Sequence, residues 1–175
     1  MLLDAVRAIT RGRVTAELAE GSEPVVFLVG MRINHPLRPW TWLPLIAAMG
    51  RMIAELMRHP ELGLLAAPRT FVSGRLIQVQ QYWASFEHLE RYARAADRQH
   101  LPAWRRFNTK VRDSGAVGIY HETYRVTSGG FEAVYANVPP LGLAAATSAV
   151  PVARGRSAAQ RLGERDDDVQ PVEGY

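Results

Sequence analysis

The pattern of hydrophobic and polar positions divides most of the chain into segments typical of strands and amphipathic helices. Residues 25–33, VVFLVGMRI, are apolar on both faces and partly β-branched, which predicts a central strand. Residues 39–58 carry apolar side chains at three- and four-residue spacing, which predicts a helix with one buried face. The positions on that face are Trp42, Leu45, Ile46, Met49, Ile53, Leu56 and Met57.

Further along the chain, the same patterns predict four more strands and two more helices. The strands are expected over residues 64–73, 76–83, 117–126 and 131–138, and a glycine-rich turn makes the last two an antiparallel hairpin. The helices are expected from residue 86, capped by Ser85, to about 97, and from Pro102 to the stop at Ser114-Gly115. Alternation along residues 76–83 gives one face with Ile77, Val79, Gln81 and Trp83 and another with Leu76, Gln78, Gln80 and Tyr82.

The two ends of the chain have weaker patterns than its centre. Residues 1–24 are predicted to form an N-terminal arm or helix, because apolar positions recur there at roughly helical spacing. Residues 25–140 are predicted to be the folded domain. Residues 141–175 begin as an apolar extension of low complexity and end as a polar segment, for which we expect a disordered tail.

The order of the predicted elements indicates the fold class. The series β-α-β-β-α-α-β-β is the split β-α-β pattern of an α+β, ferredoxin-like fold with one added strand. Its helices cover one face of an antiparallel sheet, and a chain of this size has no spare helix for the other face. Two sheets packed face to face would cover both, so the pattern predicts a homodimer.

The composition excludes several classes of protein. The chain has 175 residues and no cysteine, which excludes disulfides, thiolate metal sites and a cysteine nucleophile. Its net charge of +4 comes from scattered arginines, which indicates a solvated basic surface and no nucleic-acid partner. The sequence contains no zinc-finger spacing, phosphate-binding glycine loop, H-E-x-x-H motif or G-x-S-x-G elbow, so no metal site is predicted.

The sequence predicts no transmembrane segment. Residues 1–14 lack the continuous apolar stretch and the cleavage site of a secretory signal. The uncharged run over residues 41–50 ends at Arg51 and is too short to span a bilayer, although a helix of this kind would also suit a membrane surface. We therefore expect a cytoplasmic protein.

The strand GIYHETYRV is the best candidate for chemistry. Alternation puts His121 on one face and Glu122 and Tyr124 on the other. A strand centre with these side chains is costly to bury unless they have hydrogen-bond partners or face a polar cavity. His121 or Glu122 would then be placed for proton transfer, and a structural network at a dimer interface is the alternative.

His100 is a second candidate. It lies just before the N-terminus of a predicted helix, where the helix dipole disfavours a charged imidazole. A neutral histidine at this place can act as a base or as a ligand of a metal or haem iron, and a capping or surface histidine is the alternative.

Three further residues are candidates for binding a ligand. Tyr82 and Trp83 end a strand, where aromatic rings can line an apolar pocket or simply pack in the core. Asn34 ends the first predicted strand and would supply a polar group at the rim of such a pocket.

Several long motifs together resemble a known family. They include VVFLVGMRIN, W-x-W-L-P, P-E-L-G-L, QYW-x-S-F-E-x-L-E-x-Y-A-R, D-x-x-H-x-P-A-W-R-x-F-N and V-G-I-x-H-E-T-Y. Over about residues 10–145 the chain resembles bacterial relatives of the fumagillin-pathway monooxygenase, formerly a domain of unknown function. That family looks like a branch of the dimeric α/β-barrel superfamily, which includes antibiotic-biosynthesis monooxygenases.

The resemblance implies a monooxygenase-like enzyme that acts on a hydrophobic small molecule, such as a secondary metabolite, in a pocket of a homodimeric α/β barrel. Many members of the superfamily need no metal or flavin and let a deprotonated substrate react with oxygen. Others bind haem, including haem-degrading oxygenases and aldoxime dehydratases. The cofactor therefore stays open between none and haem, and the alternatives are a haem-binding protein and a non-enzymatic module that binds small molecules.

The recurrent polar positions of that family map onto nine residues of this sequence. The catalytic candidates are His121, Glu122, Tyr124 and His100, and the substrate-binding candidates are Asn34, Tyr82, Trp83, Trp104 and Arg105. In this hypothesis His121 or Glu122 is the base, Tyr124 and Asn34 orient the substrate, and the two tryptophans wall the site.

Overall fold

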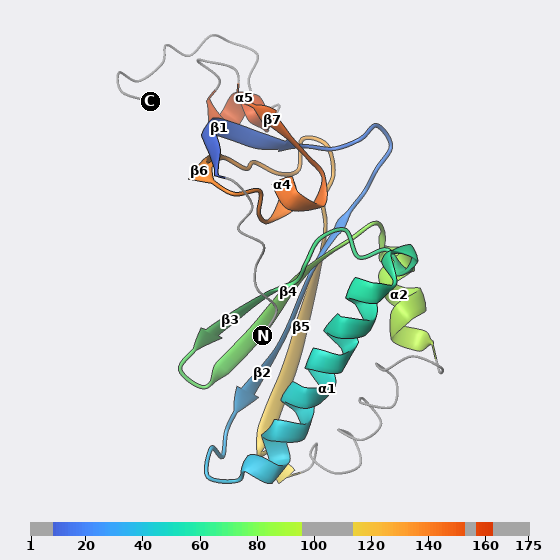
Figure 1. The fold of residues 1–175 in the computed structure, drawn as a ribbon, viewed down its shortest axis with the longest axis vertical. Helices are drawn as coiled ribbons and strands as arrows, with labels where there is room; N and C mark the ends of the chain where they lie inside the picture. Colours follow the sequence, from blue (N-terminus) through green and yellow to red (C-terminus); the bar gives the residue numbers. More distant parts are fainter. Residues whose placement is uncertain (1–8, 96–113, 153–156, 163–175) are drawn as a thin grey trace. The chain divides into compact units, whose positions relative to one another are not determined.

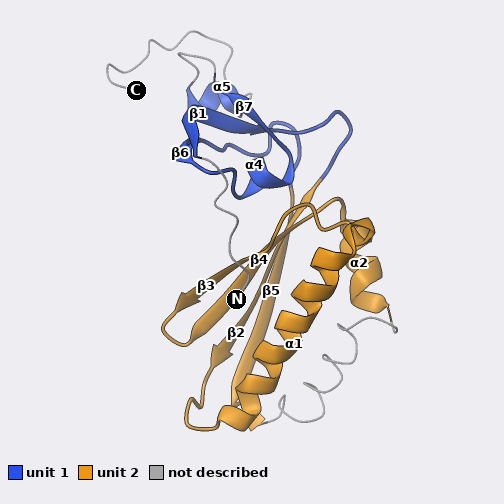
Figure 2. Cartoon of the chain, viewed as in Figure 1, with its two compact units in different colours: residues 1–23, 126–175 blue, residues 24–125 orange. Residues whose placement is uncertain are grey.

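The computed structural model describes residues 9–95, 114–152 and 157–162 (Figure 1). The chain divides into two compact units (Figure 2). The larger unit is residues 24–125, and the smaller unit combines residues 1–23 with residues 126–175.

The larger unit is built on a four-stranded antiparallel sheet with the order β3-β4-β2-β5. Its strands are β2 (Val25–Ile33), β3 (Arg69–Ser73), β4 (Leu76–Trp83) and β5 (Val117–Arg125). The predictions for β2, β4 and β5 are confirmed to within one residue. β3 is shorter than predicted, because Pro68 cannot donate a ladder hydrogen bond and Leu64 forms only an isolated bridge with Trp83.

Helix α1 (Pro39–Arg58) runs along one face of this sheet, and its predicted limits are confirmed (Figure 1). Pro44 is the sixth residue of the helix, past the first turn, and has no N–H to donate to the carbonyl of Trp40. A single 3-10 turn, η1 (Pro60–Leu62), ends at Gly63, whose φ of 94° is left-handed. Helix α2 (Phe86–Arg94) begins at the predicted cap, where the Ser85 hydroxyl accepts the His88 N–H at 3.4 Å.

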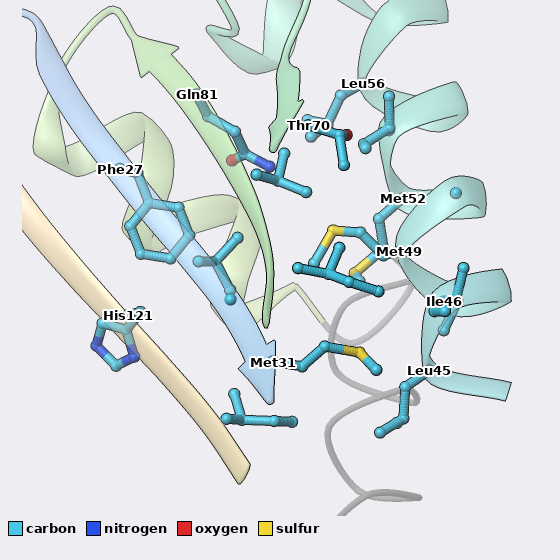
Figure 3. Close-up of a pocket in the computed structure, with 18 of the residues that line it drawn as sticks. Phe27, Met31, Leu45, Ile46, Met49, Met52, Leu56, Thr70, Gln81 and His121 are labelled. Carbon is cyan, nitrogen blue, oxygen red and sulfur yellow. The ribbon is translucent and has the colours of Figure 1, made fainter. Parts of the chain in front are cut away.

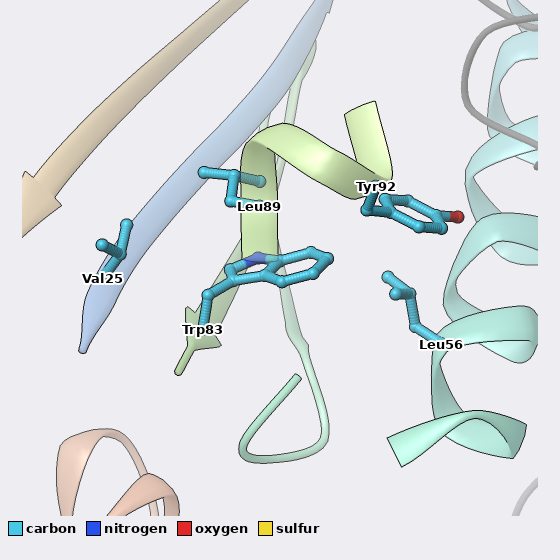
Figure 4. Close-up of a cluster of buried hydrophobic side chains, with 5 residues drawn as sticks. All are labelled: Val25, Leu56, Trp83, Leu89 and Tyr92. Carbon is cyan, nitrogen blue, oxygen red and sulfur yellow. The ribbon is translucent and has the colours of Figure 1, made fainter. Parts of the chain in front are cut away.

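The main core cluster joins the sheet to both helices at one end of α1. Trp83 is 1% exposed and its ring lies 5.6 Å from the ring of Tyr92, which comes from α2 (Figure 4). Val25, Leu56 and Leu89 complete the cluster, so β2, β4, α1 and α2 all contribute to it. Burial of these large apolar groups fixes both helices on the same face of the sheet.

The smaller unit contains a three-stranded antiparallel sheet with the order β6-β1-β7. Its elements are β1 (Thr10–Glu17), β6 (Tyr135–Val138), β7 (Ser148–Pro151), α4 (Leu143–Ala146) and α5 (Ala158–Arg161). The Arg161 guanidinium binds the Glu132 carboxylate through Nε at 2.8 Å, which joins α5 to the segment before β6.

Three expectations from the sequence are wrong in this unit. Thr10–Glu17 is a strand and not a helix or an irregular arm, because its partners are β6 and β7, more than a hundred residues away in the chain. β6 pairs with β1 and forms no hairpin with β5. The region after residue 140 contains α4 and β7, and residues 157–162 form a capped helical turn where disorder was expected.

The fold class is confirmed as α+β, with antiparallel sheets and a ferredoxin-like arrangement of helices on one sheet face in the larger unit. Among the helices in the described residues, none is both long and apolar enough to cross a membrane.

Candidate active site

His121 and Glu122 lie on opposite faces of the larger sheet. In β5, His121 shares the face of α1 with Ile119, and both line a cavity there. Glu122 is on the other face, where its carboxylate accepts a 2.7 Å hydrogen bond from the hydroxyl of Tyr124. The cavity on the α1 side is therefore lined by His121 and not by Glu122.

The cavity lies between the sheet and α1 and has a volume of about 310 Å³ (Figure 3). That volume falls at the lower end of the range found for small-molecule sites. Four strands and two helices surround it, and all lining residues belong to the larger unit. The lining is predominantly aliphatic, with aromatic rings at one end.

The floor of the cavity consists of cross-strand rows on one face of the sheet. The central row joins Thr70, Val79, Val29 and His121 on four neighbouring strands. A row on one side contains Ile77, Met31 and Ile119, and a row on the other side contains Gln81 and Phe27. The alternation predicted along β4 is thus confirmed, because the face with Ile77, Val79, Gln81 and Trp83 lines the cavity.

Helix α1 supplies the roof of the cavity. Its lining side chains recur at helical spacing and include two methionines: Leu45, Ile46, Met49, Met52, Ile53 and Leu56. Figure 3 shows both methionines projecting from α1 toward the sheet, with Met31 opposite them on β2. Methionine side chains are unbranched and adaptable, so this roof can accommodate ligands of different outlines.

Besides the indole of Trp83, four side chains bring polar groups to the cavity lining: His121, Thr70, Tyr92 and Gln81. The His121 ring lies 5.7 Å from the Phe27 ring, on an exposed part of β5 (Figure 3). Thr70 is also exposed, on edge strand β3. The Tyr92 hydroxyl donates a 2.8 Å hydrogen bond to the Glu55 carboxylate.

Gln81 and Tyr92 are the buried members of this set, and each has 5% of its surface exposed. The side-chain oxygen of Gln81 accepts a 2.9 Å hydrogen bond from the indole N–H of Trp83, two residues along β4. Gln81 opens the motif QYW-x-S-F-E but was not among the predicted site residues. The alternation of β4 could have singled it out, because it puts one amide among Ile77, Val79 and Trp83.

The other face of the sheet has its own polar pairs. The Tyr120 hydroxyl donates to the Gln78 side-chain oxygen at 2.7 Å, and the Gln80 amide donates to the Tyr82 hydroxyl at 2.9 Å. The hydrogen bond from Tyr124 to Glu122, and then the negative charge of that carboxylate, raise the pKa of Tyr124 above its ordinary value.

The sequence candidates therefore separate into groups. His121 and Trp83 both line the cavity, whereas Tyr82, Glu122 and Tyr124 are on the opposite face of the sheet. Asn34 is not among the cavity residues: its amide donates to the Gly115 carbonyl at 2.9 Å and its oxygen accepts from Arg32. The remaining candidates lie outside the described residues: His100, Trp104 and Arg105.

Comparison with known proteins gives matches of three kinds. The family model described as "Monooxygenase af470-like" matches residues 24–143. A curated protein of Aspergillus fumigatus, "Monooxygenase af470", is 31% identical over 152 residues, which are 76% of this chain and 53% of that protein. The chain therefore spans about half the length of the curated relative that it matches.

Among solved structures, aldoxime dehydratase (OxdRE) in complex with butyraldoxime has a TM-score of 0.64 and 18% identity over 81% of this chain and 41% of that chain. A second aldoxime dehydratase has a TM-score of 0.58 and 15% identity, with coverages of 90% and 48%. At these sequence identities the similarity to the aldoxime dehydratases concerns the fold alone.

Proposed function

The chain belongs to the monooxygenase af470-like family, and on this basis we propose that it is a monooxygenase for a hydrophobic small molecule held between the sheet and α1. The observation that carries the proposal is an imidazole, His121, at the edge of a cavity whose other lining groups are nearly all apolar. An apolar molecule gains by leaving water for such a cavity, and the imidazole beside it can act as a general base.

The reaction that suits these residues needs an activated methylene in the substrate. His121 accepts a proton from that carbon, and the resulting carbanion passes electrons to dioxygen. One oxygen atom ends as a new carbonyl group and the other leaves as water, so the methylene supplies all four electrons and no external reductant is needed. The apolar walls exclude water from the carbanion while it reacts.

The test is oxygen consumption with anthrone-type and other phenolic polyketide substrates. We expect one equivalent of dioxygen consumed per carbonyl formed, with one oxygen atom of labelled dioxygen in the product. If none of these compounds increases oxygen uptake above the rate without protein, the proposed reaction is wrong.

A haem-dependent function is a second candidate, because His121 offers a nitrogen ligand to the cavity. The described residues fit this group incompletely: none of the lining side chains among them is a cation that would pair with the two propionates. His100 lies outside the described residues. No step is therefore assigned to haem. An absorption spectrum after haem addition tests this candidate, which fails if no Soret band forms or if His121→Ala leaves the band unchanged.

A non-enzymatic module that binds small molecules would use the same cavity without turnover. Ligand binding without oxygen uptake would favour this alternative over the monooxygenase.

We also propose that the chain forms a homodimer through the sheet face opposite α1. On and beside this face, Tyr124 is 52% exposed and Phe71 is 49% exposed, next to the half-buried apolar residues Val26 and Leu28. A second copy would cover these groups. Light scattering of the purified protein measures the mass, and a monomer at micromolar concentration would contradict the dimer. A cytoplasmic location stays a prediction.

A further inference from the structure

Gln81 has a fixed orientation in the cavity lining. An indole N–H can only donate a hydrogen bond, so the group that Trp83 meets must be the amide oxygen of Gln81, at 2.9 Å. The two possible assignments of the amide are therefore not equivalent, and the NH2 group is directed away from Trp83. Figure 3 shows this nitrogen on the side of the amide toward the cavity.

The NH2 group has no hydrogen-bond partner among the described residues. Gln81 is 95% buried, and the one hydrogen bond of its side chain is the one that its oxygen accepts. Its neighbours on the same face are apolar, with Phe27 directly opposite on β2 and Val79 two residues earlier on β4. Among the described residues, no side-chain nitrogen or oxygen is both fully buried and without a partner, so this nitrogen reaches the open space of the cavity. A ligand that fills the cavity and displaces water must bring an oxygen to this donor or leave it unsatisfied, which is costly.

The other polar groups of the lining do not have this property. Thr70 and His121 lie on exposed parts of edge strands, where water can satisfy them. The Tyr92 hydroxyl is already bound to Glu55. The cavity thus has one buried polar contact to offer, and that contact is a neutral donor.

We propose that Gln81 is a specificity-determining residue whose amide NH2 donates a hydrogen bond to an uncharged acceptor, such as a ketone or quinone oxygen, on an otherwise apolar ligand. The inference rests on the proposed function only in using the same cavity. A ligand hydroxyl can also accept from this amide, but its own O–H would then point at apolar walls. A ligand ammonium group has no acceptor here, and a hydrocarbon leaves the donor unsatisfied.

The test compares two ligands of nearly the same shape, 2-acetylnaphthalene and 2-isopropylnaphthalene. Their dissociation constants are measured by equilibrium dialysis with the full chain, for the wild type and for Gln81→Met. Methionine keeps the length of the side chain and removes the donor. We expect the ketone to lose roughly threefold to tenfold in affinity while the hydrocarbon binds as well or better, because one hydrogen bond contributes about that much.

Two further variants make the comparison specific. Gln81→Glu still accepts from Trp83 but presents an acceptor in place of the NH2 group, so it should also weaken the ketone. Gln80→Met is the matched control: it removes the neighbouring glutamine, whose amide binds Tyr82 on the opposite sheet face, and should leave both affinities unchanged. Retained binding of the hydrocarbon shows that each variant is folded.

An equal loss for both ligands in Gln81→Met, or no loss for either, would overturn the inference. Failure of both ligands to bind the wild type would overturn it as well. These results are separate from the test of the proposed function. Selective loss of the ketone, with no oxygen uptake by any substrate, supports the role of Gln81 and contradicts the monooxygenase.

Discussion

The hydroxyl of Tyr120 reaches the side-chain oxygen of Gln78 at 2.7 Å by crossing over β2, the strand between them. It crosses at Gly30, which is the direct cross-strand neighbour of both residues. A Cβ atom at Gly30 would lie 2.4 Å from Cε1 of the tyrosine ring. The glycine is therefore needed here for close approach and not for an unusual backbone angle.

Gly30→Ala should destabilise the protein by about 1–2 kcal/mol, because the added methyl group displaces the Tyr120 ring and breaks its hydrogen bond to Gln78. Denaturant unfolding measures the change. In a Tyr120→Ala background the same substitution should cost much less, since the clash is absent. Gly50→Ala is the matched control: this glycine is in α1 with open space around its Cβ, and alanine there should stabilise by about 0.5–1 kcal/mol. Equal effects at the two glycines would contradict the argument.

His121→Asn should lower kcat/KM of the proposed reaction by about a hundredfold or more, because asparagine keeps a polar group at the cavity but cannot take the proton. Glu122→Gln should change it by less than about twofold, since this carboxylate is on the other sheet face with Tyr124. Steady-state oxygen uptake gives both values. A larger loss of kcat/KM in Glu122→Gln than in His121→Asn would contradict the assignment of His121 as the base.

Tyr124 should titrate above its ordinary value in the folded protein, because its hydroxyl donates to the Glu122 carboxylate, whose charge opposes the phenolate. A raised folded-state pKa contributes stability below the unfolded-state pKa, and this contribution is lost as the pH rises through the folded-state pKa. Ultraviolet absorbance across the alkaline range measures the titration, and Tyr124→Phe identifies its curve. Glu122→Gln should move that curve to lower pH; an unchanged curve would mean that the hydrogen bond does not form in solution.

Ser85→Ala should destabilise the protein by about 1 kcal/mol, because it removes the N-cap of α2, whose Leu89 and Tyr92 pack in the main core. Ser85→Thr keeps the hydroxyl and should lose much less. Thermal unfolding at neutral pH compares the two variants.

The same serine also affects Glu87. A hydrogen bond from Ser85 lowers the pKa of the Glu87 carboxyl below its ordinary value. A lowered folded-state pKa contributes stability above the unfolded-state pKa, which is lost as the pH falls through the folded-state pKa. The destabilisation by Ser85→Ala should therefore shrink in acid. NMR titration of Glu87 should show its pKa rising in the variant, and an unchanged pKa would contradict the hydrogen bond.

The sequence determined most of the local structure of the larger unit. It also determined that His121 and Glu122 lie on opposite faces of the sheet. Hydrophobic periodicity predicts β2, α1, β4 and β5 because each element must bury one face. The spacing of apolar residues within each segment is enough to show that face. Alternation also requires His121 and Glu122 to face opposite ways, whatever the fold. It does not say which of them faces the helices.

Only the tertiary structure decided which of His121 and Glu122 faces α1, how β1 pairs, and that Gln81 lines the cavity. The pairing of β1 with β6 and β7 depends on contacts across more than a hundred residues, which no local pattern contains. Gln81 differs from Gln80 in sequence only by one position, and each could belong to a core or to a surface. The cavity and the Trp83 donor distinguish them, because only Gln81 lines the cavity and the indole N–H fixes which of its amide atoms is the oxygen.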